Sequence, residues 1–420
     1  MRARLRLGDP ADARAAAALL VAAGYRVLGQ TDPAPADLLV VDEWTPEDAP
    51  SVQAARLVGT RVTVLAELVL AGAPRPLVAV TGTAGKTSTC RALEDILRAS
   101  GHEVVISSTA RANNAWPDHS LAGPAHAGAV TVAEMTSTHL CHMGSVHPDV
   151  AVITMIRPDH VEMHGSLDRY LAAKRKVVAH LIPGDAVVLP VDDPETCVAL
   201  GPITAAVWGF GVSHSARQPG AFAVGGQVVL DDGRAREYCP APASGPALRA
   251  ALAAGAAALS LGLAPTDVAH AMSSIRPVPH RIHRLVGPGG VTLVDDTMAA
   301  TPLKALAAIT EFGTRDLVLV VGGDDAPAGV RVHAAPEEEA VLARALGAAR
   351  DAARLLVAFG PASDRVRAHV RPDVVTNDIN EAMDVALGAA ASTGAHVLVS
   401  PMFPLTTQDR DHVASLGTAS

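Results

Sequence analysis

The sequence predicts an α/β protein with largely parallel sheets, because short β-branched runs alternate along it with Ala- and Leu-rich stretches of helical periodicity. Its 420 residues are enough for two or three domains of ordinary size. The expected strands span residues 38–41, 77–80, 103–106, 130–133, 150–154, 186–189, 291–294, 317–321, 355–358 and 397–399. The expected helices span residues 86–99, 167–180, 302–312 and 337–349.

Two stretches rich in proline and glycine mark the expected domain boundaries. Residues 71–76 read Ala-Gly-Ala-Pro-Arg-Pro, and residues 275–281 read Ile-Arg-Pro-Val-Pro-His-Arg. The sequence therefore predicts three domains: a small N-terminal α/β domain over 1–75, a central domain over 76–281 and a C-terminal domain over 282–420. Residues 218–246 carry turn signals at Gly225-Gly226 and Asp232-Gly233, which indicate hairpins.

The composition argues against nucleic-acid and membrane partners. The chain has 34 Lys and Arg against 43 Asp and Glu, so it has no overall basic field, and its 11 aromatic residues are too few for a stacking platform. Every apolar run is shorter than the ~18 residues of a membrane span. The cysteines, Cys90, Cys141, Cys197 and Cys239, form no CxxC pair, which is typical of a reducing compartment. We expect a cytoplasmic protein.

The strand expected at 77–80 leads directly into Thr-Gly-Thr-Ala-Gly-Lys-Thr-Ser at residues 81–88, and a helical pattern follows. Glycines let backbone N–H groups turn toward a phosphate, and the start of the helix adds its positive end. Lys86 is expected to reach the terminal phosphates and the Thr87 hydroxyl to bind Mg²⁺. Val80 stands where the usual loop has its first glycine, so the loop is a variant. The alternative is a tight turn with a solvated lysine.

This loop and the motifs that follow it resemble those of the Mur ligase family, the ATP-dependent amide ligases that include folylpolyglutamate synthetase. The further matching segments are Glu134-Met-Thr-Ser-Thr, Asp159-His-Val-Glu-Met-His-Gly-Ser-Leu-Asp-Arg-Tyr-Leu-Ala-Ala-Lys174, Pro279-His-Arg281, Val294-Asp-Asp-Thr297, Gly322-Gly-Asp324 and Ser400-Pro401. They occur in the family's order from residue 77 to residue 401, and the first domain resembles the family poorly.

The resemblance implies a central P-loop ATPase-type domain, a C-terminal Rossmann-like ligase domain and an N-terminal domain of the substrate-binding kind. It also implies ATP and Mg²⁺ as cofactors. The nucleotide-binding residues that it implies are Thr83, Gly85, Lys86, Thr87, Ser88, Arg281 and Asp296. The metal ligands that it implies are Thr87, Glu134 and His160.

The reaction implied by the resemblance transfers the γ-phosphoryl group of ATP to a carboxylate, and an amine then attacks the acyl phosphate. Lys86, His160 and Lys174 are the implied catalytic residues, and Lys174 stands where the family often has a carbamylated lysine. Asn113 and Asn114 resemble an Asn pair that lines the path of the first substrate, although an ordinary loop pair is the alternative. The expected partners are a small carboxylate and an amine.

Several departures from the family pattern bear on the substrate. No GxGxxG follows the first strand, so the sequence leaves open whether a UDP-sugar binds there, and Gly245-Pro-Ala-Leu-Arg-Ala replaces a His-Asn-x-x-Asn segment that touches nucleotide. Met298 stands where the D-glutamate-adding enzyme has a lysine, and Asp325-Ala326 replaces a Gly-Lys pair. Both losses remove positive charge near the incoming amino acid. The sequence therefore favours a specialised, secondary-metabolite amide ligase over D-glutamate addition in cell-wall synthesis.

Other interpretations stay open at this level. The chain could be a nucleotide-binding scaffold or subunit without ligase activity, a P-loop phosphotransferase or NTPase, or a cell-wall precursor ligase. His139 and His142, in a cluster with His147, His160 and His164, could ligate zinc, but a strong zinc site needs three or four ligands of defined geometry. Cys141 has no visible base and is expected to be a small buried thiol.

Overall fold

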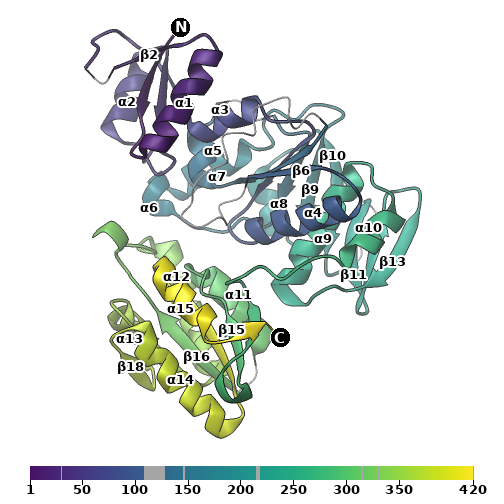
Figure 1. Cartoon of the computed structure of the whole chain (residues 1–420), viewed down its shortest axis with the longest axis vertical. Coiled ribbons are helices and arrows are strands. Elements are labelled where there is room, and N and C mark those ends of the chain that lie inside the picture. The colour runs from purple at the N-terminus through teal and green to yellow at the C-terminus, as the bar shows by residue number, and fades with distance from the viewer. Residues whose placement is uncertain are drawn as a thin grey trace. The chain divides into compact units, whose positions relative to one another are not determined.

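The computed structural model describes residues 1–29, 31–107, 128–144, 147–213, 218–313, 316–329 and 331–419 (Figure 1). The chain folds as two compact units, Met1–Arg276 and Pro277–Ser420. The α/β class is confirmed, with three separate sheets in the described chain. The boundaries after residues 75 and 281 stay predictions.

The N-terminal part of the first unit is a small parallel sheet of order β2-β1-β3-β4. Its strands are β1 (Arg2–Arg6), β2 (Arg26–Leu28), β3 (Leu38–Val41) and β4 (Arg61–Val64), and its helices are α1 (Pro10–Ala22), α2 (Pro50–Leu57) and α3 (Leu65–Ala71). The Asp9 side chain accepts a hydrogen bond from the Ala11 N–H at 2.6 Å and so caps α1, which has Pro10 in its first turn. All four residues of β3 are buried, which makes it the core strand of this sheet.

A nine-stranded sheet of order β13-β12-β11-β10-β9-β8-β5-β7-β6 forms the rest of the first unit. Its strands are β5 (Leu77–Thr81), β6 (Val104–Ser107), β7 (Val130–Met135), β8 (Val150–Ile153), β9 (Ala186–Pro190), β10 (Ala206–Gly211), β11 (Gly220–Val224), β12 (Gln227–Asp231) and β13 (Arg236–Pro240). The pairings from β6 to β11 are parallel, whereas β11, β12 and β13 are joined by the two expected antiparallel hairpins.

Helices cover both faces of this sheet, which is why its central strands are apolar on both sides. They are α4 (Lys86–Ala99), α5 (Ser137–His142), α6 (Val161–His164), α7 (Leu167–Arg175), α8 (Pro194–Leu200), α9 (Gly245–Ser260) and α10 (Pro265–Met272). Val78 and Val80 of β5 pack in the core with α4 and α9, and Leu77 and Ala79 pack on the opposite side with α5 and α7. Strand β5 is thus an interior strand, between β8 and β7, and the phosphate loop begins at its carboxyl end.

The second unit holds a seven-stranded sheet of order β18-β17-β16-β19-β15-β14-β20. Its strands are β14 (His283–Val286), β15 (Thr292–Asp295), β16 (Leu317–Gly322), β17 (Ala353–Phe359), β18 (Val374–Thr376), β19 (His396–Met402) and β20 (Thr418–Ala419). Its helices are α11 (Pro302–Phe312), α12 (Pro336–Ala352), α13 (Ser363–His369), α14 (Ile379–Thr393) and α15 (Thr407–Ser415), with short 3₁₀ turns at Pro288–Gly290 and Pro327–Gly329. Alternate residues of β16 enter two cores, one on each face of the sheet.

One expected helix is shorter than the sequence suggests. The helix expected over 167–180 ends at Arg175, and the chain continues in turns held by i to i+3 hydrogen bonds. The Lys176 ammonium accounts for the change of direction, because it donates to the carbonyls of Cys141 and Met143 at 2.7 and 3.0 Å, which end helix α5.

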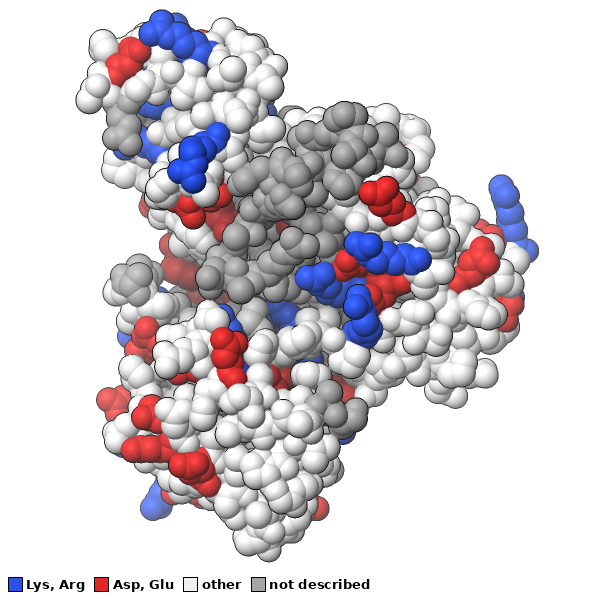
Figure 2. Space-filling model, viewed as in Figure 1, with Lys and Arg blue, Asp and Glu red and all other residues white. Residues whose placement is uncertain are grey.

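The hydropathy of the helices and the distribution of surface charge both bear on possible partners. No helix in the described part of the chain is long and apolar enough to cross a membrane. On the face shown in Figure 2, acidic and basic side chains are interspersed rather than gathered into one field of a single sign.

Candidate functional site

The phosphate loop joins the buried strand β5 to helix α4, and two glycines shape it. Gly85 has a φ of 85° and forms the N-terminal cap of α4. Gly82 has a φ of 149°, and a Cβ atom there would lie 1.9 Å from Thr154 Oγ1. The loop therefore rests on the end of β8, and the Thr83 N–H donates to the Met155 carbonyl at 2.7 Å.

Lys86 folds back over this loop. Its ammonium donates to the Gly82 and Thr83 carbonyls at 2.9 and 3.2 Å, so a cation stands beside the backbone that would cradle a phosphate. Ser88 lies half-buried in the first turn of α4. The strand, loop and helix thus have the arrangement that the sequence predicted for residues 77–99.

Thr87 and Glu134 form a buried pair beside the loop. The Thr87 hydroxyl donates to Glu134 Oε2 at 2.9 Å, and each residue is only 2% exposed. Glu134 reaches this position because β7 pairs with β5 in a register that sets it opposite Val80. A hydroxyl and a carboxylate oxygen are hard ligands of the kind that Mg²⁺ prefers, so the donor set fits that ion.

Lys174 is buried at 1% exposure, although it is a charged side chain on helix α7. Its ammonium donates to Thr81 Oγ1 at 3.0 Å and to the Gly82 carbonyl at 2.9 Å. Tyr170, one helical turn earlier, places its hydroxyl 2.6 Å from Thr83 Oγ1. Helix α7 is therefore tied to the phosphate loop by two polar side chains, of which sequence analysis singled out only Lys174.

His160 lies in a left-handed conformation with a φ of 53°, just before the short helix α6. Its ring nitrogens lie 3.6 Å from the Asp159 carboxylate and 3.5 Å from that of Glu162. Trp44 from the N-terminal part meets the His160 ring edge-on, with centroids 6.4 Å apart.

Arg281 and Asp296 lie in the second unit, where two of the quoted motifs pack together. Asp296 accepts hydrogen bonds from the Ser400 hydroxyl at 2.8 Å and the Ile282 N–H at 3.2 Å. Burial raises the pKa of Asp296 to about 7, against the opposing effects of the Ser400 hydrogen bond and the Arg281 charge. His280 and Ile282 on either side of half-buried Arg281 have φ values of 63° and 50°. Asn113 and Asn114 lie outside the described residues.

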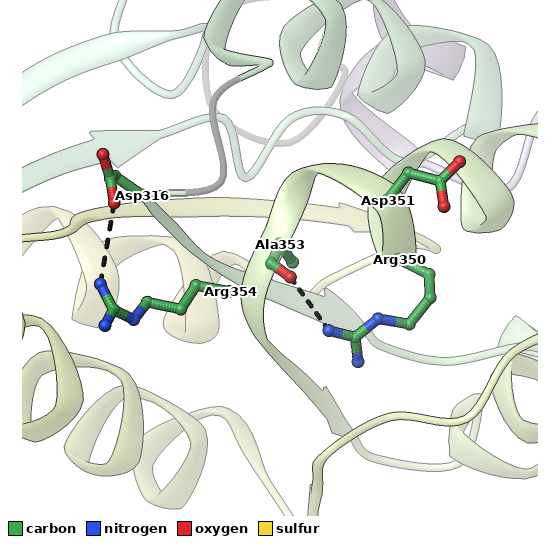
Figure 3. Close-up of a pocket in the computed structure, with 5 residues that line it drawn as sticks. All are labelled: Asp316, Arg350, Asp351, Ala353 and Arg354. Atoms are coloured by element: carbon green, nitrogen blue, oxygen red, sulfur yellow. Dashed lines mark hydrogen bonds and ion pairs between the residues drawn. The ribbon is translucent and has the colours of Figure 1, made fainter.

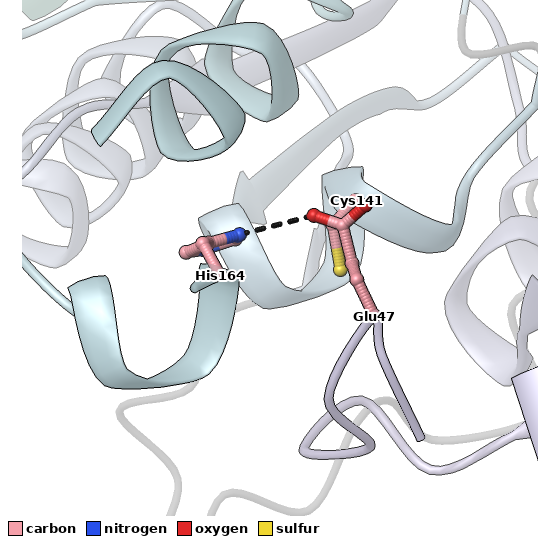
Figure 4. A group of neighbouring side chains, drawn as sticks. All are labelled: Glu47, Cys141 and His164. Carbon is pink, nitrogen blue, oxygen red and sulfur yellow. Dashed lines mark hydrogen bonds and ion pairs between the residues drawn. The ribbon is translucent and has the colours of Figure 1, made fainter. Parts of the chain in front are cut away.

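The histidines that could have formed a zinc site have different partners. His139 Nε2 contacts the Glu43 carboxylate, and His142 Nε2 donates to the Thr45 carbonyl at 2.7 Å. Among the described residues, the group with ligand atoms close together is Glu47, Cys141 and His164, all within 4.8 Å of one another (Figure 4).

The chemistry of that group favours a hydrogen-bonded cluster. Burial raises the pKa of the Cys141 thiol to about 12, so the sulfur is protonated at neutral pH. The Lys176 ammonium lies against the Cys141 carbonyl, and the Glu47 carboxylate faces His164 Nδ1 at 3.3 Å and Arg56 at 3.8 Å. We assign no ion to it.

The second unit also has a surface depression, lined by Asp316, Arg350, Asp351, Ala353 and Arg354 (Figure 3). Arg350 donates to the Ala353 carbonyl at 3.0 Å and Arg354 lies 3.7 Å from the Asp316 carboxylate. Its open, charged lining resembles ordinary protein surface, and none of the residues expected to act in the reaction lies in it.

A strand, a glycine loop and a helix joined in this way place the chain among the P-loop nucleotide-binding proteins. The family model described as the Mur ligase middle domain matches residues 80–229. The UDP-N-acetylmuramoylalanine–D-glutamate ligase of Pelotomaculum thermopropionicum is 30% identical over 363 residues, which cover 83% of this chain and 76% of that one. The UDP-N-acetylmuramoyl-L-alanine–L-glutamate ligase of Xanthomonas axonopodis pv. citri is 28% identical over 87% of this chain and 76% of that one.

Solved structures of Mur ligases have the same fold. MurF from Acinetobacter baumannii aligns with a TM-score of 0.65 at 17% identity, over 98% of this chain and 90% of that one. The MurF ligase of Thermotoga maritima in complex with ADP aligns with a TM-score of 0.62 at 18% identity, over 91% and 88%. The chain belongs to the Mur ligase family. It is an ATP-dependent, ADP-forming amide ligase, and the enzymes of this family use ATP and Mg²⁺.

Proposed function

We propose that this enzyme activates a small carboxylic acid as its acyl phosphate and joins it to an amine. A carboxylate oxygen attacks the γ-phosphorus of ATP, and the bond to the β-phosphate oxygen breaks with its electron pair leaving on ADP. The amine nitrogen then attacks the acyl carbon and loses a proton, and the C–O bond breaks to release phosphate. The observation that carries the proposal is the buried Thr87–Glu134 pair directly beside Lys86 on the phosphate loop.

Each residue of the loop has a distinct part in this proposal. Lys86 and the N–H groups at the start of α4 bind and orient the β- and γ-phosphates, with Thr83, Gly85 and Ser88 shaping their cradle. Thr87, Glu134 and His160 would hold Mg²⁺, which would neutralise charge on the phosphates. For Arg281 and Asp296 the proposed part is nucleotide binding, and for Asn113 and Asn114 it is binding of the acid.

Lys174 is proposed to act as a carbamate. The amine that the structure describes makes two hydrogen bonds, to Thr81 Oγ1 and the Gly82 carbonyl. A carbamate nitrogen keeps one N–H, so modification gives up one of these bonds, at about 1.5–3 kcal/mol for a bond from a charged group, and gains a carboxylate beside the phosphate loop. We therefore expect activity to rise with bicarbonate.

The acid and amine are proposed to differ from those of cell-wall synthesis. Met298 and Asp325 support this, because they replace positive charges expected near an incoming glutamate. A second candidate is a cell-wall precursor ligase, which the names of the two relatives favour.

One experiment tests the proposed chemistry and separates these candidates. The purified enzyme is incubated with ATP, Mg²⁺, bicarbonate, hydroxylamine and either a fractionated cell extract or UDP-N-acetylmuramoyl-L-alanine, and hydroxamates and ADP are measured by mass spectrometry. We expect an ATP-dependent hydroxamate from the extract that is lost in Lys174→Ala. A hydroxamate of the muramoyl substrate with stimulation by D- or L-glutamate would favour the second candidate. ADP without hydroxamate from either source would contradict the proposed acyl transfer.

A further inference from the structure

A loop of the N-terminal part, residues 43–47 between β3 and α2, is fixed on the central sheet by three buried histidines. Each histidine is at most 2% exposed. The three contacts join Glu43 to His139, the Thr45 carbonyl to His142 Nε2 at 2.7 Å, and Glu47 Oε1 to His164 Nδ1 at 3.3 Å. The loop is therefore held at three of its five residues.

Trp44 is the side chain that this loop presents outward. It is 46% exposed, whereas the carboxylates of Glu43 and Glu47 on either side are turned onto His139 and His164. The loop thus exposes the apolar ring of Trp44, whereas its two glutamate carboxylates are paired with histidines. A half-exposed indole on a loop held in this way can contact an apolar ligand group, because a bulky aromatic side chain with few rotatable bonds keeps the entropic cost of binding low.

Trp44 also lies beside one proposed catalytic residue, His160. Its ring meets that of His160 edge-on with centroids 6.4 Å apart. On the same loop, the contact from Glu47 continues through His164 to the Tyr170 ring, 5.5 Å away, and from the Tyr170 hydroxyl to Thr83 of the phosphate loop at 2.6 Å. The loop that carries Trp44 is therefore connected to the phosphate loop.

We propose that Trp44 binds an apolar group of the acid substrate close to its carboxylate, so that the enzyme selects acids with an aliphatic or aromatic substituent there. This proposal rests on the proposed function, since His160 marks the site only if it serves the phosphoryl transfer. The indole ring packs on the substituent and thereby orients the carboxylate toward the γ-phosphate.

Binding is tested apart from catalysis. In Trp116→Phe/Trp208→Phe protein, Trp44 is the single remaining tryptophan, and its fluorescence is followed on titration with 3-phenylpropionate, octanoate and, for comparison, glycolate, each with ATP analogue and Mg²⁺. We expect a saturable change with an apolar acid and at least tenfold weaker response with glycolate. An emission that none of the acids alters, or alters equally, would overturn the proposal.

Catalysis supplies the second readout. In the hydroxamate assay, Trp44→Ala is expected to raise KM for an apolar acid at least tenfold with KM for ATP within twofold, and Trp44→Phe to restore most of the loss. Trp208→Phe, in the core strand β10, is the matched control with unchanged KM. An unchanged acid KM in Trp44→Ala would refute the assignment. A fluorescence response without any hydroxamate would leave Trp44 as an acid-binding residue and remove the proposed ligase chemistry instead.

Discussion

Replacing Gly82 with alanine should lower the free energy of unfolding, because the added Cβ would clash with the residues that support the phosphate loop. A Cβ there would lie 1.9 Å from Thr154 Oγ1 and 2.9 Å from the Met155 carbonyl oxygen, at a φ of 149°. The backbone strain costs about 1–2 kcal/mol and the overpacking about 1–3 kcal/mol. Gly85→Ala is the matched control, because its Cβ has no neighbour closer than 3.5 Å and only the strain of a φ of 85° applies.

Thermal unfolding of the full chain measures the difference. In a unit of this size each kcal/mol is worth about 2 °C, so we expect Gly82→Ala to lower the Tm of the first unit by about 4–10 °C and Gly85→Ala by about 2–4 °C. Adding Thr154→Ala to Gly82→Ala should recover about 1 kcal/mol relative to additivity, since the closest clashing atom is removed. Equal Tm values for the two glycine variants, with no coupling to Thr154, would refute this description of the loop.

Three further predictions follow from the site. Burial raises the pKa of Asp296 to about 7, so the folded state keeps a proton that the unfolded state has already lost. The free energy of unfolding therefore falls by up to about 4 kcal/mol as the pH rises from about 4 to 7. The Tm of the wild type minus that of Asp296→Asn should fall between pH 5 and 8, and a constant difference would contradict the burial effect. Glu134→Gln should raise the Mg²⁺ concentration for half-maximal activity at least tenfold, and an unchanged Mg²⁺ titration would exclude Glu134 as a ligand. A water-soluble thiol reagent at pH 8 should modify the half-buried Cys197 before Cys141, because Cys141 is buried and its thiol pKa is raised to about 12. Peptide mapping locates the modified cysteine. Rapid labelling of Cys141 would show that its thiol is accessible.

The elements that carry the phosphate loop could be predicted because their signals are local. Helix α4 begins and ends where its periodicity predicts, at Lys86 and Ala99, and the strand before it extends by a single residue to Thr81. The resemblance named Thr87 and Glu134 as ligands of one metal, and the structure brings their side chains together because β7 pairs with β5.

Long-range contacts could not be predicted in the same way. The hydrogen bonds from loop 43–47 reach His142 and His164, 97 and 117 residues away, and no periodicity in the sequence encodes such pairings. Helix α9 was missed because its alanines give it no polar face, and it is buried through residues 250–259. The role of Tyr170 was also not predicted, because its hydroxyl contacts Thr83, 87 residues away, only once α7 packs against the phosphate loop.

The measurement that tests the proposed chemistry most directly follows the oxygen of the acid. With the acid identified by hydroxylamine trapping and labelled with ¹⁸O in both carboxylate oxygens, the enzyme is supplied with ATP, Mg²⁺ and the amine, and the released phosphate is analysed by ³¹P NMR. An acyl phosphate requires one ¹⁸O to leave with phosphate and the other to remain in the amide. Phosphate that carries one ¹⁸O per amide formed is the predicted result, and unlabelled phosphate would contradict the central claim.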